Sequence, residues 1–121
     1  MILPHGTADM VIMNPPFTRP TNHKKTDVPV PSFAGLGTGS KEQKLMSKKL
    51  KKLRRCIEKA VGDGNAGLGS DFADLADVKL REGGVLALVL PLTVLMGDSW
   101  RKLRNKLAAD YTDIILSLIH I

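Results

Sequence analysis

Two short apolar runs, each ended by proline, limit what this chain can fold into more than any other feature. The first run, Ala8–Met13, stops at Asn14-Pro15-Pro16, and the second, Val85–Leu90, stops at Pro91. Continuous apolar runs of this length are typical of parallel strands buried on both faces. Proline has no amide hydrogen to donate to a sheet, so each strand must end where its proline begins. The sequence therefore predicts two buried parallel strands, each followed by a rigid turn.

A helix is predicted between the two runs. Ser40-Lys41-Glu42-Gln43 has the pattern of a capping box, with serine at the N-cap and glutamine three residues later. Apolar residues then recur at steps of three and four, which predicts one buried stripe on a helix. The stripe consists of Met46, Leu50, Leu53, Ile57 and Val61. The glycine-rich segment 62–69 is expected to end this helix and to form a flexible loop.

Two further helices and a third strand are expected downstream. Ser70 is the predicted N-cap of the second helix, and Gly83-Gly84 its predicted end. The expected buried face of that helix consists of Phe72, Leu75, Ala76 and Leu80. The third helix is expected to follow Asp98 or Ser99, with its core side formed by Trp100, Leu103 and Leu107. Residues 113–119 are expected to form the last strand. Alternation of strands and helices predicts an α/β fold of about three parallel strands with helices on both faces.

The positive charge of the chain is concentrated on one segment. The 121 residues carry a formal net charge of +6, and half of the lysines and arginines lie between Lys41 and Lys59. Such a helix can contact the phosphates of a nucleic acid, or it can be an ordinary solvated face. The residues predicted to bind phosphates are Lys48, Lys49, Lys51, Lys52, Arg54 and Arg55.

Other classes of site and location receive no support from the sequence. Cys56 is the only cysteine, so an intrachain disulfide and a cysteine-rich zinc site are excluded. His5, His23 and His120 have no metal-ligand spacing, so no metal site is expected. There is no apolar run of eighteen residues and no signal-peptide pattern at the N-terminus. We therefore expect no membrane association and a cytoplasmic location.

Asn14-Pro15-Pro16-Phe17 is the motif that carries chemistry. The exocyclic amine of a purine is a poor nucleophile because its lone pair is delocalised into the ring. Two acceptors, a side-chain amide oxygen and a peptide carbonyl held rigid by proline, favour a pyramidal nitrogen and so activate it. An aromatic residue beside them offers a flat surface for a base rotated out of its duplex. In position and composition, this motif resembles motif IV of the amino-methyltransferases.

The segment downstream strengthens the resemblance. Val85–Leu90, its proline and the basic helix that begins near Trp100 resemble the arrangement in adenine-N6 DNA methyltransferases of restriction–modification systems. The resemblance implies the Rossmann-like fold of S-adenosylmethionine-dependent enzymes, with adenine in DNA as substrate. It also implies that the side chain of Asn14 and the carbonyl of Pro15 accept from the amine, that Pro16 stiffens the turn and that Phe17 stacks on the base. Asp9 matches a common acidic position for which a structural role is expected.

One part of the family pattern does not appear. The strand and glycine-rich turn that hold S-adenosylmethionine should precede the motif, and no cofactor-binding residues are identified in this sequence. We therefore expect residues 1–121 to be a single partial catalytic domain, the C-terminal half, with 18–69 as a variable insertion of loop and basic helix. Such a fragment is expected to be inactive alone and to need a complementary cofactor-binding chain or a specificity subunit.

Two alternatives remain open at this point. The first is a methyltransferase for another planar amine, either a base of ribosomal RNA or the glutamine of a release factor. The second is a non-catalytic module that binds nucleic acid through the basic helix alone.

Overall fold

The computed structural model describes residues 3–16 and 40–118, without the side chains of 40–43, 46 and 47. Several predictions fall outside this part of the chain. They concern Phe17, the loop before Ser40, the side chain of Met46, and Ile119.

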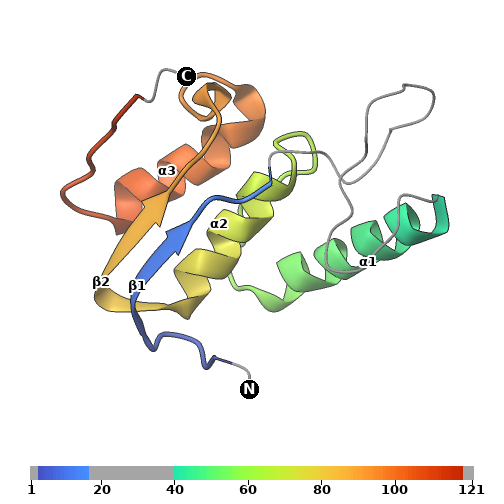
Figure 1. Ribbon diagram of the computed structural model, residues 1–121, viewed down its shortest axis with the longest axis horizontal. Helices are drawn as coiled ribbons and strands as arrows, with labels where there is room; N and C mark the ends of the chain where they lie inside the picture. The colour runs from blue at the N-terminus through green and yellow to red at the C-terminus, as the bar shows by residue number, and fades with distance from the viewer. Residues whose placement is uncertain (1–2, 17–39, 119–121) are drawn as a thin grey trace.

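The described chain is an α/β structure built on one pair of parallel strands (Figure 1). Strand β1 spans Ala8–Met13 and strand β2 spans Leu80–Leu88. Helices α1, Ser40–Cys56, and α2, Leu68–Lys79, lie between them in sequence. Two short 3₁₀ turns, η1 at Leu92–Val94 and η2 at Asp98–Trp100, lead into helix α3 at Arg101–Asp110. The two predicted strands are confirmed as a parallel pair, and the predicted third helix is confirmed after Asp98.

Gly83 and Gly84 form an irregularity within β2 and do not end a helix, which corrects the prediction. Strand β1 advances by two residues, from Ala8 to Met10, while β2 advances by five, from Leu80 to Val85. Gly83 takes a positive φ of 73°, and a Cβ on Gly84 would lie 2.9 Å from the carbonyl oxygen of Asp9. Glycine is therefore required at both positions because the backbone turns and the strands approach closely there.

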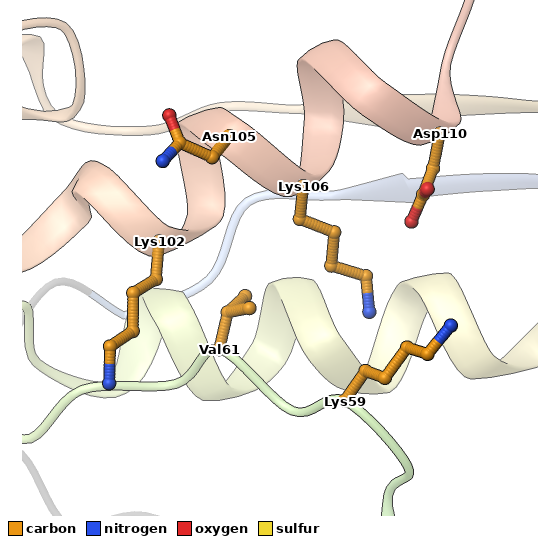
Figure 2. Close-up of a pocket in the computed structure, with 6 residues that line it drawn as sticks. All are labelled: Lys59, Val61, Lys102, Asn105, Lys106 and Asp110. Atoms are coloured by element: carbon orange, nitrogen blue, oxygen red, sulfur yellow. The ribbon is translucent and has the colours of Figure 1, made fainter.

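Helices α2 and α3 both cover the same face of the sheet, as the view past them onto the strands shows (Figure 2). Trp100 and Leu103 pack against Ala66 and Ala73, and the partly buried Leu88 of β2 packs against this cluster. The opposite face leaves large apolar side chains in solvent. These exposed residues are Met10, Ile12, Val85 and Val89. The predictions of strands buried on both faces and of helices on both faces are therefore wrong for the described chain.

The predicted third strand is also absent from the part of the chain that is described. Residues 114–118 have no regular secondary structure, and Ile114, Ile115, Leu116 and Leu118 are exposed. An apolar run specifies a strand only when a neighbouring strand accepts its backbone hydrogen bonds. Neither β1 nor β2 pairs with this segment, so the sheet formed by residues 3–16 and 40–118 has two strands where about three were expected.

Helix α1 projects from the two layers formed by the sheet and the pair α2–α3 (Figure 1). It ends at Cys56, before the last two residues of the predicted apolar stripe. Lys59 then takes a positive φ of 57° and turns the chain toward α2. Ile57 is buried and Val61 is half-buried beyond the helix, so both pack although neither is helical.

Candidate functional site

The Asn14-Pro15-Pro16 segment leaves the carboxyl end of β1, beside the end of β2. The amide of Val89 donates to the carbonyl of Met13 at 3.0 Å, so the strands remain paired up to the residue before Asn14. Pro91 follows two residues after Val89, and both proline turns therefore leave the same edge of the sheet. In open α/β sheets, ligands bind outside the carboxyl ends of the strands. The predicted motif lies at the edge where a ligand is expected.

The two predicted acceptors are uncommitted within the described chain. The side chain of Asn14 is exposed, whereas Pro15 is buried and Pro16 is half-buried. Within residues 3–16 and 40–118, neither the Asn14 side chain nor the Pro15 carbonyl takes part in a hydrogen bond. The Pro15 carbonyl is held in place because packing holds the buried ring, the ring fixes φ, and the following Pro16 confines the ψ of Pro15 to the extended region. This turn therefore offers an amide oxygen and a carbonyl oxygen for a ligand to donate to.

The turn after β2 is fixed by an arginine of helix α3. Arg104 of α3 donates through Nη1 to the carbonyls of Val94 at 2.8 Å and Gly97 at 2.7 Å. These carbonyls belong to the segment that contains η1 and follows Pro91. Arg104 thus braces the second proline turn against α3, and a long basic side chain serves a structural role there.

The turns after β1 and β2 do not fit S-adenosylmethionine. The turns after β1 and β2 begin with Asn14-Pro15 and with Leu90-Pro91, and neither is rich in glycine. Prolines at these positions place rings where a glycine-rich turn lets the backbone approach a ligand. The described residues do not form the cofactor site that the resemblance implies.

A buried polar cluster joins the end of α1 to α2. Asp71 is 1% exposed and binds the Arg54 guanidinium through two contacts, Nε–Oδ1 at 2.5 Å and Nη2–Oδ2 at 2.8 Å. This hydrogen-bonded pairing raises the pKa of Arg54. Bidentate pairs of this kind are strong and fix geometry. Asp71 therefore ties the last turns of α1 to the first turn of α2.

Asp74 holds the segment after α1 in the same cluster. Its carboxylate accepts from the amide of Val61 at 2.9 and 3.0 Å and from the amide of Gly62 at 2.6 Å. Lys106 of α3 lies 3.9 Å from Asp74 and 2.9 Å from Asp77. A Cβ on Gly62 would overlap Asp71 and would approach Asp74 to 3.1 Å. The segment predicted as a flexible loop is therefore fixed at its start by a carboxylate.

Ser70 lies within the first turn of α2 and is not its N-cap, which corrects the prediction. The helix begins at Leu68, with Gly67 at the N-cap. The Ser70 hydroxyl donates to the carbonyl of Asp63 at 3.1 Å or of Gly67 at 3.0 Å, and accepts from the amide of Asp63 at 3.0 Å. Of the four apolar residues predicted to be buried on this helix, only Ala76 is fully so. The most buried side chains of α2 include Ser70, Asp71 and Asp74, which the apolar periodicity did not reveal.

Burial raises the pKa of Asp74, although the amides of Val61 and Gly62 and the charge of Lys106 oppose the shift. The folded chain therefore takes up a proton at a pH at which the unfolded chain, with an aspartate pKa of about 3.9, does not. The contribution of Asp74 to the free energy of unfolding should increase as pH falls from neutral through the raised pKa, and level off below about 3.9. Comparison of denaturant unfolding of the parent and of Asp74→Asn across this range checks the prediction. A stability difference independent of pH would contradict it.

The residues predicted to bind phosphates divide into two groups. Lys48, Lys49, Lys51, Lys52 and Arg55 are exposed on the projecting α1. Arg54 is different, because its guanidinium is bound by Asp71 and only 25% of its side chain is exposed. Arg54 therefore anchors the helix, and its guanidinium is occupied by Asp71. Since eight of the 17 residues of α1 are basic, sequence alone does not separate the anchor from its neighbours.

The remaining candidates have no catalytic geometry. Asp9 forms an exposed ion pair with Arg81, in keeping with the structural role expected for it. His5 and Cys56 are exposed. In residues 3–16 and 40–118, no three histidine, cysteine, aspartate or glutamate residues are grouped so that they could hold a metal ion. Over the same ranges, no helix has both the length and the apolarity needed to cross a membrane.

Comparison with known proteins gives no relative: no protein-family model, no curated protein and no solved structure matches this chain.

Proposed function

We propose that this chain presents the target amine in the methylation of adenine N6 in DNA. The observation that carries the proposal is the state of the Asn14-Pro15-Pro16 turn. Two hydrogen-bond acceptors, the side-chain oxygen of Asn14 and the carbonyl oxygen of the buried Pro15, lie at the carboxyl edge of a parallel sheet. Neither accepts a hydrogen bond from a residue that the structure describes. This is the arrangement that an exocyclic amine needs for both of its hydrogens.

These two oxygens would make the target amine a better nucleophile. When both N–H groups of the amine donate, its nitrogen becomes pyramidal and its lone pair is directed away from the ring. Acceptors that are already in place favour this geometry without reorganising during the reaction. Phe17, the next residue in sequence, supplies the stacking surface for the flipped base in this proposal.

DNA is the proposed substrate because of charge. The exposed lysines lie on helix α1, which projects from the rest of the described chain (Figure 1), and the net charge of the chain is +6. The phosphates of a DNA duplex attract a positively charged helix of this kind, independently of base sequence. The methyl donor would be S-adenosylmethionine, held by residues outside the described ranges or by a second chain, since the described turns do not fit it.

The proposal is tested by loss of one acceptor. The full chain is joined behind a polypeptide that supplies the cofactor-binding half of an adenine-N6 methyltransferase. Transfer of labelled methyl groups from S-adenosylmethionine to duplex DNA is then measured. Asn14→Ala is expected to lower the rate about 10²-fold or more, the size of effect seen when one preorganised hydrogen-bonding group is removed.

Asn65→Ala is the matched control, because Asn65 is also exposed but lies in the turn before α2. Its rate should equal that of the parent. Equal rates for Asn14→Ala and the parent would overturn the proposal. Methyl transfer to ribosomal RNA or to a release-factor glutamine, without transfer to DNA, would instead show that another planar amine receives the methyl group.

A further inference from the structure

Leu92 and Met96 are two large apolar side chains that the turn after Pro91 exposes to solvent. Leu92 is 65% exposed and Met96 is 85% exposed. They lie four residues apart in a helical turn, so their side chains share one side of it. Val94 and Leu95 are partly buried, and Val94 packs against the core cluster. The inner residues therefore attach the turn to the core, while its outer side presents apolar groups to solvent.

The turn that carries these two side chains is rigid. The amide of Val94 donates to the carbonyl of Pro91 at 2.9 Å, and the amide of Gly97 donates to the carbonyl of Thr93 at 2.7 Å. A Cβ on Gly97 would lie 2.8 Å from that same Thr93 carbonyl oxygen, so the turn closes tightly only with glycine there. Arg104 of α3 binds two further carbonyls of the turn. The exposed apolar groups thus stand on a support that is fixed before any ligand arrives.

The position of the turn relates it to the Asn14 motif. Both follow the carboxyl ends of paired strands and so leave the same edge of the sheet (Figure 1). Arg101 and Lys102, exposed residues in the first turn of α3, come next in the chain, against one exposed acid, Asp98. Basic side chains beside apolar ones favour DNA as the partner, because its phosphates attract them, whereas charged residues are depleted from the cores of protein interfaces.

We propose that Leu92 and Met96 form an apolar wedge that contacts DNA bases left unstacked when the target base rotates out of the duplex. Rotation of a base removes the stacking of its neighbours and leaves a gap in the duplex. Leucine and methionine are among the side chains that proteins insert between base steps. The inference rests on DNA as the proposed substrate. It adds a second contact at the same edge, one that holds the opened duplex and does not touch the amine.

The test compares binding of the full chain to two short DNA duplexes that differ in one T·T mismatch. Thymine has no exocyclic amine, so the comparison does not depend on the Asn14 acceptors. The parent is expected to bind the mismatched duplex about fivefold more tightly, because a mismatched base unstacks at lower cost. Leu92→Ser/Met96→Ser should abolish this preference. The slope of log K against log salt should stay unchanged, since an apolar contact releases no counterions.

Leu3→Ser/Ile115→Ser is the matched control, because it removes two exposed apolar side chains outside the turn. It should retain the preference for the mismatch. Circular dichroism checks folding, and Met96→Ser alone tests the same prediction if the double variant misfolds.

Four results would overturn the wedge. They are no DNA binding by the parent, equal affinity of the parent for the two duplexes, equal loss of preference in the wedge and control variants, and a reduced salt slope in the wedge variant. The last result would show a lost phosphate contact instead of a base contact. The proposed function fails separately, through unchanged methyl transfer in Asn14→Ala, because the preference for the mismatch requires neither an amine nor a methyl donor.

Discussion

A Trp100→Ala variant is expected to lose about 3–5 kcal/mol of unfolding free energy, the usual cost of removing a large aromatic side chain from a core. Trp100 is 3% exposed and packs with Leu103 against Ala66 and Ala73. It therefore joins α3 to α2 and to the segment before α2. Domains of this size have a total stability of roughly 5–15 kcal/mol, so the loss should be a large fraction of the stability of the chain.

Urea unfolding followed by far-ultraviolet circular dichroism measures this loss. Tryptophan fluorescence cannot serve, since Trp100 is the only tryptophan. Met96→Ala is the control, because Met96 is a large apolar residue that is exposed and lies four residues away. Its change should stay within about 0.5 kcal/mol. Equal midpoints for Trp100→Ala and the parent would show that α3 does not depend on this side chain.

Two arginine–aspartate pairs with the same Nε–Oδ1 distance of 2.5 Å are expected to differ severalfold in their contribution to stability. Asp71→Ala should lower the free energy of unfolding by about 3 kcal/mol, because it removes one partner of a buried pair and leaves the other charge uncompensated. Asp9→Ala should cost roughly 0.2–1 kcal/mol, because Asp9 is 84% and Arg81 is 48% exposed. Burial, not distance, decides the difference.

The loss of Asp71 should also free α1. Limited proteolysis is expected to cleave between α1 and α2 earlier in Asp71→Ala than in the parent, since Arg54 no longer holds the helix. Asp9→Ala should leave that cleavage unchanged. Equal unfolding free energies for the two variants would contradict the structural role of the Arg54–Asp71 pair.

The elements that local sequence specifies were predicted well. Each of the two apolar runs before a proline forms part of the parallel pair, because proline ends a strand regardless of its surroundings. Helix α3, its core residue Leu103 and Trp100 at its N-cap also follow directly from apolar spacing. The position of Asn14 at the carboxyl edge follows in turn, since it is the first residue after its strand.

The errors share one physical cause, which is that partners distant in sequence decide pairing and burial. Gly83-Gly84 was expected to stop a helix, but the close approach of β1 makes it a bulge in β2. Residues 113–118 have the composition of a strand and no strand beside them. Apolar spacing does not reveal the burial of Asp71 and Asp74, which are buried because Arg54 and the amides of Val61 and Gly62 bind them.

The sequence by itself determined where the strands stop, that Asn14-Pro15-Pro16 follows the first of them, and that positive charge gathers on one helix. These features depend on proline geometry and on residue type, which act locally. Only the tertiary structure decided that Arg54 is an anchor and that Asp74 fixes the segment after α1. Such contacts join residues many positions apart, and the burial that gives them their strength exists only once the chain has folded.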